Sequence, residues 1–97
     1  MRCRQAHPTE RCHCFFDGKV QGVGFRYTAQ NLALNFDVYG YVRNLPDGRV
    51  ELVVEGEPRE VHHFIDDLKQ RMGDYIRNAK IEPEPPTGEF SRFQIAF

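Results

Sequence analysis

The sequence predicts an α+β fold with the element order β-α-β-β-α-β and one short extra strand at the C-terminal end. Two observations lead to this prediction. Two segments carry apolar residues at the three-to-four-residue spacing of amphipathic helices, and the segments between them alternate apolar and polar residues as half-buried strands do. Two helices on one face of a mainly antiparallel sheet form the ferredoxin-like sandwich.

Length and composition narrow the class of protein. The 97 residues suit one domain, and 40% hydrophobic residues can fill a modest core. The formal net charge of −1 lacks the basic excess of nucleic-acid binders. No apolar run approaches the ~20 residues of a membrane helix, and the first ten residues lack the apolar centre of a signal peptide. We therefore expect a cytoplasmic protein with no nucleic-acid or membrane partner.

The chain begins with a polar segment and a strand. Residues 1–10 show no periodicity and predict an N-terminal arm that precedes a domain covering residues 11–97. The first strand is expected at residues 12–17. Three side chains should share its inward face: Cys12, Cys14 and Phe16.

The tripeptide Cys12-His13-Cys14 could also be interpreted as a metal-binding motif. In a strand, however, the His13 side chain points to the face opposite the two cysteines, so the three cannot close on one ion. An odd count of three cysteines also argues against a secreted disulfide scaffold. We expect no metal, and the two cysteines to behave as small buried apolar residues.

The middle of the chain predicts a helix and a hairpin. A helix should start near Phe25, with its apolar stripe formed by Phe25, Ala29, Leu32, Ala33 and Phe36. Strands are expected at residues 38–45 and 49–55, because both are rich in β-branched or aromatic residues and enclose the turn-forming Pro46-Asp47-Gly48.

The last third predicts a helix and two strands. Pro58 opens the helix and Gly73 closes it. His62 and His63 flank its apolar stripe and are expected to be solvated rather than catalytic. A fourth strand is expected at residues 75–82, a loop at 83–88, and a final strand at 90–97 with three apolar side chains on one face: Phe93, Ile95 and Phe97.

One stretch predicts an anion site. Residues 18–26 read Gly-Lys-Val-Gln-Gly-Val-Gly-Phe-Arg and join the first strand to the first helix. Glycines permit positive φ angles, and backbone N–H groups at a helix start favour an anion such as phosphate. Arg26 falls in the first helical turn, where a cation is disfavoured unless an anion is bound. The alternative is an ordinary glycine-rich turn with a surface arginine; the spacing matches neither a Walker nor a dinucleotide loop.

The glycine-rich stretch and a second motif, Gly40-Tyr41-Val42-Arg43-Asn44, together resemble the acylphosphatase family. The resemblance runs from about residue 11 to residue 97. It implies a stand-alone hydrolase that acts on small acyl phosphates as a monomer, without cofactor or metal. Arg26 and Asn44 match the family's catalytic positions, and the residues that match its phosphate-binding loop are Gly18, Lys19, Val20, Gln21, Gly22, Val23 and Gly24.

The period of two in the second strand gives an independent argument for Asn44. Gly40, Val42 and Asn44 share the inward face, and an inward amide needs a partner. Asn44 could orient a water for in-line attack on a phosphate held by Arg26; it could also merely stabilise the turn before Pro46. The carboxylate leaving group needs no protonation at neutral pH, which fits motifs that contain no Asp, Glu or His.

Two other functions remain open. The chain could be a phosphate- or carbamoyl-phosphate-binding module, like the acylphosphatase-like domain of the hydrogenase-maturation carbamoyltransferases. It could also be a non-catalytic ferredoxin-like domain that binds RNA or protein through aromatic residues on its open sheet face, such as Phe15, Tyr39 and Tyr41. The charge balance argues against the RNA-binding function.

Overall fold

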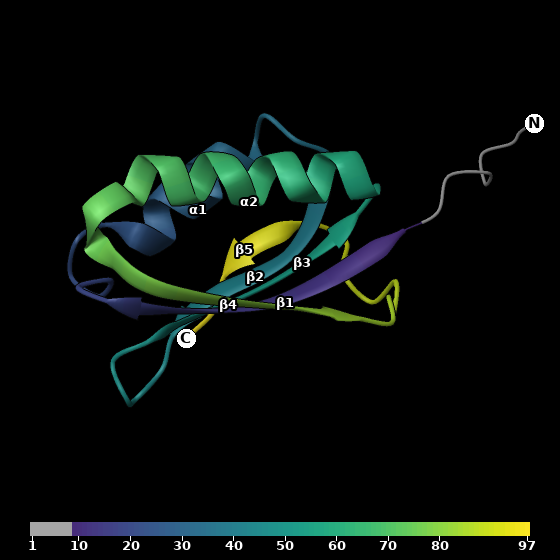
Figure 1. Cartoon of the computed structure of the whole chain (residues 1–97). Coiled ribbons are helices and arrows are strands. Elements are labelled where there is room, and N and C mark those ends of the chain that lie inside the picture. Colours follow the sequence, from purple (N-terminus) through teal and green to yellow (C-terminus); the bar gives the residue numbers. More distant parts are fainter. Residues whose placement is uncertain (1–8) are drawn as a thin grey trace, which may run out of the picture.

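The computed structural model describes residues 9–97, and its elements follow the predicted order (Figure 1). The elements are β1 (Glu10–Gly18), α1 (Phe25–Ala33), β2 (Val38–Asn44), β3 (Val50–Gly56), α2 (Pro58–Met72), the 3₁₀ turn η2 (Gly73–Tyr75), β4 (Ile76–Glu84) and β5 (Phe93–Ile95). The strands form one sheet in the order β4-β1-β3-β2-β5. All neighbours are antiparallel except β2 and β5, which are parallel. Both helices cover the same face, and the predicted α+β ferredoxin-like fold is confirmed.

The core lies between this face of the sheet and the helices. Cys12, Cys14 and Phe16 are buried in it, as the alternation of β1 predicts, and His13 lies on the opposite face. The stripe of α1 packs on the same core, with the rings of Phe16 and Phe25 5.1 Å apart. Gly40 and Val42 are likewise buried, so the inward face of β2 was predicted correctly.

Several element boundaries differ from the predicted ones by a few residues. Strand β4 continues through Pro83 to Glu84, where a loop was expected. Because β4 is an edge strand, Pro83 removes no hydrogen bond between strands on the side of β4 that faces solvent. Strand β5 has only three residues, and Phe97 beyond it is 95% exposed rather than in the apolar row. Phe36 lies past the end of α1 but still packs against Phe64.

Two remaining predictions concern the ends and the surface of the chain. The expected arm, residues 1–10, lies outside the described residues except for its last two, and Glu10 is the first residue of β1. His62 and His63 are exposed on α2, as expected, and His62 pairs with Glu10. Within residues 9–97, none of the helices has the length and apolar character needed to cross a membrane.

Candidate functional site

The pairing of the three central strands brings the two sequence motifs to the same end of the sheet. Phe16 of β1 and Asn44 of β2 are both register partners of Val50, the first residue of β3. The segment that begins with the last residue of β1, residues 18–24, is here called the glycine loop; it therefore starts at the same end of the sheet at which β2 ends (Figure 1). Because β3 lies between them, the backbones of β1 and β2 are two strand spacings apart, roughly 10 Å.

Backbone conformation and burial fix the glycine loop at this end. Gly22 and Gly24 have φ angles of 79° and 81°, a left-handed conformation that glycine adopts without strain. Val20 is fully buried and Val23 packs at the edge of the core. At Gly18 a side chain has no room, since a Cβ atom would lie 2.4 Å from the carbonyl oxygen of Tyr75.

The glycine loop leads directly into the N-terminus of α1. Gly24 is the N-cap residue, no side chain caps the helix, and its first turn contains no acidic residue. The first intrahelical hydrogen bond runs from the Thr28 N–H to the Gly24 carbonyl. The N–H groups of the preceding residues therefore have no acceptor within the helix and remain available to a ligand. Together with the helix dipole, they favour an anion.

A pocket of about 150 Å³ joins these parts. It is lined by Val20, Gly22, Gly24, Phe25, Arg26, Tyr27 and Asn44. The structure thus brings Arg26 and Asn44 to one pocket with three residues of the glycine loop, whereas the other loop residues named from the sequence do not line it: Gly18, Lys19, Gln21 and Val23. Sequence reasoning did not include Phe25 and Tyr27 among the site residues.

The polar side chains of this pocket belong to Arg26, Tyr27 and Asn44. Within the described residues, Arg26 and Asn44 have no side-chain hydrogen bond, and Arg26 has no acidic partner. The Arg26 guanidinium carbon lies 5.5 Å from the centroid of the Phe97 ring, within range of a cation–π contact. An arginine that lacks a carboxylate partner and lines a pocket at a helix N-terminus is suited to binding an oxyanion.

The side chain of Gln21 has a structural contact that the sequence did not predict. Its Nε2 donates hydrogen bonds to the carbonyl oxygens of Leu45 and Arg49, at 2.8 and 2.9 Å. These two residues flank the turn between β2 and β3. Both amide hydrogens of Gln21 thus bind the hairpin, and the side chain connects the glycine loop to the residue that follows Asn44. A contact between a loop and a distant turn leaves no spacing signal in the sequence.

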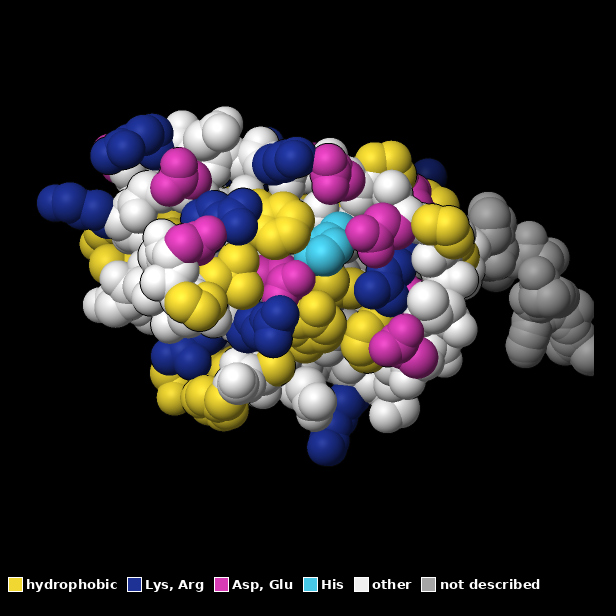
Figure 2. All heavy atoms as spheres, turned by 90° about the horizontal axis from the view of Figure 1, so that it is seen from below, with side chains coloured by type: hydrophobic (Ala, Val, Ile, Leu, Met, Phe, Trp, Pro, Cys, Tyr) yellow, Lys and Arg dark blue, Asp and Glu magenta, His cyan; other side chains and the backbone are white. Residues whose placement is uncertain are grey.

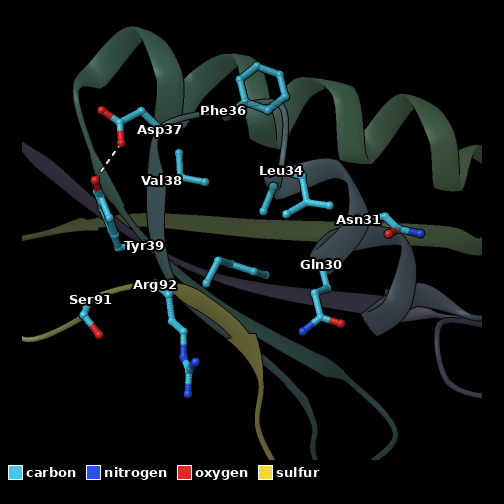
Figure 3. Close-up of a pocket in the computed structure, with 11 residues that line it drawn as sticks. Gln30, Asn31, Leu34, Phe36, Asp37, Val38, Tyr39, Ser91 and Arg92 are labelled. Atoms are coloured by element: carbon cyan, nitrogen blue, oxygen red, sulfur yellow. Dashed lines mark hydrogen bonds between the residues drawn. The ribbon is translucent and has the colours of Figure 1, made fainter.

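A larger pocket of about 530 Å³ lies at the opposite end of α1 (Figure 3). Its walls include Leu34, Phe36 and Val38, with Asp37 hydrogen-bonded to the Tyr39 hydroxyl at its rim. None of the residues named from the two motifs lines it. We therefore place the candidate site in the smaller pocket, which residues of both motifs line.

The open face of the sheet mixes charged side chains with hydrophobic ones (Figure 2), and several of the charged ones form a network of ion pairs. His13 lies between Glu51, at 2.6 Å, and Glu84, at 2.8 Å, while Arg11 binds Glu55 and Glu84. Burial alone would raise the pKa of Glu51, but hydrogen bonds from Arg43 and His13 outweigh it, so that pKa lies below its usual value. The face is therefore occupied by mutually satisfied charges.

The same balance acts on Glu55. Burial opposes ionisation, but the backbone N–H of Thr87, the Arg11 guanidinium and the backbone N–H of Gly88 bind the carboxylate and lower its pKa. On the inward face, by contrast, burial raises the pKa of the Cys14 thiol to about 12. Cys14 thus stays a neutral thiol at physiological pH, as expected of a small core residue.

Comparisons with known proteins show the family and the fold to which the chain is similar. The acylphosphatase family model matches residues 12–95. The chain is 45% identical to an acylphosphatase from Syntrophus aciditrophicus (strain SB) over 89 residues, which cover 91% of this chain and 93% of the relative. Its fold matches the crystal structure of acylphosphatase from Bacillus subtilis with a TM-score of 0.83, 30% identity, and coverage of 91% and 99% of the two chains.

A longer protein also contains this fold. Full-length HypF, solved in a phosphate- and nucleotide-bound form, matches with a TM-score of 0.83 and 25% identity. The match covers 99% of the present chain but 13% of HypF.

Proposed function

The chain belongs to the acylphosphatase family and is an enzyme of that kind; we propose that it hydrolyses the carboxyl-phosphate bond of acyl phosphates in the pocket lined by Arg26 and Asn44. The products are a carboxylate and inorganic phosphate. One observation carries the proposal: Arg26 and Asn44, which come from separate motifs and have no side-chain hydrogen bond or ion pair within the described residues, line a single pocket at the N-terminus of α1. The size of this pocket fits a small anion, since drug-sized ligands occupy roughly 300–1,000 Å³.

In the proposed mechanism, the phosphoryl group binds at the helix N-terminus. The Arg26 guanidinium grips two of its oxygens as a planar fork, and backbone N–H groups of the glycine loop bind the remaining charge. Asn44, at the end of β2, orients a water in line with the departing acyl oxygen. The leaving carboxylate has a low pKa and departs without a proton, so positioning and charge stabilisation supply the catalysis.

Substitution of Arg26 by lysine tests the proposed binding role. Arg26→Lys keeps the positive charge but loses the fork, so binding of the phosphoryl group should weaken strongly. Inorganic phosphate, a product, should inhibit the unmodified enzyme competitively and the variant at least tenfold less tightly. Equal phosphate inhibition of both proteins would show that Arg26 is not the main ligand of the anion.

The mechanism assigns no step to a metal. Hydrolysis of benzoyl phosphate should therefore proceed at the same rate after treatment with a chelator. A strict requirement for magnesium or zinc, restored by adding the ion back, would contradict the mechanism. The same assay separates the enzyme from a phosphate- or carbamoyl-phosphate-binding module, the alternative that the sequence leaves open. Such a module would bind phosphate without releasing it from benzoyl phosphate.

We expect the enzyme to act as a monomer and not to bind nucleic acid. The aromatic side chains of the open face support the second expectation. Arg49 lies 4.7 Å from the Phe15 ring centroid and His13 stacks on the same ring at 4.6 Å, so other side chains already contact that ring. Glu51 and Glu55 add buried negative charge to this face. Salt-dependent RNA binding would contradict this expectation.

A further inference from the structure

Asn44 pairs with fewer neighbouring strands than the central residues of β2 do. Strand β5 pairs with β2 only at Gly40–Val42, so at Asn44 the ladder continues on one side alone, with Val50 of β3. The turn that follows Asn44 projects beyond the sheet (Figure 1). Asn44 is thus the last residue of its strand, pairs with one neighbouring strand only, and precedes a projecting turn. Such a residue needs another contact to hold a fixed position.

Gln21 supplies that contact. The carbonyl of Leu45 already accepts the Gly48 N–H at 3.1 Å, and the carbonyl of Arg49 accepts the Leu45 N–H at 2.8 Å. These two bonds close the turn, and each carbonyl uses its second acceptor position for one hydrogen of the Gln21 amide. One side chain of the glycine loop is thereby bonded to the residue that follows β2 and to the residue that precedes β3, at the turn of the hairpin.

We propose that Gln21 is a positioning residue, which fixes the distance between the glycine loop and Asn44 through its two hydrogen bonds to Leu45 and Arg49. The inference rests on the proposed function, in which the loop and Arg26 hold the phosphoryl group and Asn44 holds the water. The distance between the two reacting groups then depends on the contact between loop and hairpin. A misplacement of about 1 Å can cost a factor of about 10² in rate.

The substitution Gln21→Glu tests this role with little change in shape. An ionised carboxylate has no hydrogen to donate, so both bonds to the carbonyls are lost. We expect kcat for benzoyl phosphate to fall roughly ten- to a hundredfold. Because the new negative charge itself repels phosphate, the phosphate comparison is made on Gln21→Met, which keeps the length without charge. In Gln21→Met kcat should fall by the same factor, while the inhibition constant of inorganic phosphate changes less than twofold, because the loop backbone and Arg26 remain.

Gln30→Glu is the matched control. Gln30 lies on α1, lines the other pocket and has no hydrogen bond to the hairpin, so this substitution should leave kcat and phosphate inhibition unchanged. A second control combines Gln21→Met with Asn44→Ala. If Gln21 acts through Asn44, the double variant should be no slower than Asn44→Ala alone.

The outcomes separate this inference from the proposed function. If Asn44→Ala and Arg26→Lys behave as proposed but Gln21→Met retains normal kcat, the positioning role is wrong and the proposed function stands. Phosphate affinity that falls as much as kcat, or losses that multiply in the double variant, would also overturn the positioning role. If Asn44→Ala itself keeps normal turnover, the proposed role of Asn44 fails and the inference fails with it.

Discussion

Asn44→Ala should separate chemistry from stability and from phosphate binding. The Asn44 side chain has no hydrogen bond within the described residues, so its removal leaves no protein group unpaired. The free energy of unfolding should therefore change by no more than about 0.5 kcal/mol, as for surface substitutions. Loss of one aligned hydrogen bond in the transition state costs about 3–4 kcal/mol, a factor of about 10²–10³ in kcat.

The assay follows the hydrolysis of benzoyl phosphate, with inorganic phosphate as a competitive inhibitor and urea unfolding as the measure of stability. Asn78→Ala, at an exposed position of β4, is the matched control and should behave as the unmodified enzyme. Near-normal turnover of Asn44→Ala would refute the reasoning, because Asn44 would then have no part in orienting the water. A phosphate affinity that drops with kcat would instead place Asn44 among the ligands of the anion.

Two further predictions concern stability. Gly18→Ala should lower the free energy of unfolding by several kcal/mol more than Gly48→Ala, as measured by urea titration. Both substitutions add a Cβ at positive φ, but only the Cβ at position 18 would lie 2.4 Å from a backbone oxygen. Equal losses of stability would mean that backbone strain, and not the steric clash, decides the effect. The folded-state pKa of Glu55 is lowered, so its ionised form stabilises the protein above the unfolded value of about 4.3, and this contribution disappears as the pH falls through the lower folded value. Glu55→Gln should therefore cost stability at pH 7 and much less at pH 3; the same loss at both pH values would contradict this.

The fold was predictable because its signals are local. Alternation in β1 and β2 and the apolar stripe of α1 each follow from a few neighbouring residues, and the structure confirms which face is inward. The glycine motif placed the loop correctly for the same reason. Arg26 and Asn44 line one pocket because of the order of the strands in the sheet. Local sequence signals do not give this order, and the two residues were paired in advance only through the resemblance to a family.

Features that depend on distant contacts were not predictable. Glu51 and Glu55 are almost fully buried although charged residues are normally exposed, because partners from three other segments compensate them. The contact of Gln21 depends on where a hairpin folds in space. The position of Phe97 over Arg26 arises because the ladder of β5 ends at Ile95, whereas the apolar alternation continues to the last residue.

The position of β3 between β1 and β2 has a consequence for folding kinetics. Neither the glycine loop nor Asn44 can reach its place until β3 has paired with both of its neighbours, one of which precedes it in sequence by more than thirty residues. Such nonlocal pairing is slow compared with the formation of helices. During refolding, enzymatic activity should consequently return after the helical circular dichroism signal. The rate at which activity returns would then report the rate at which the three central strands complete their pairing.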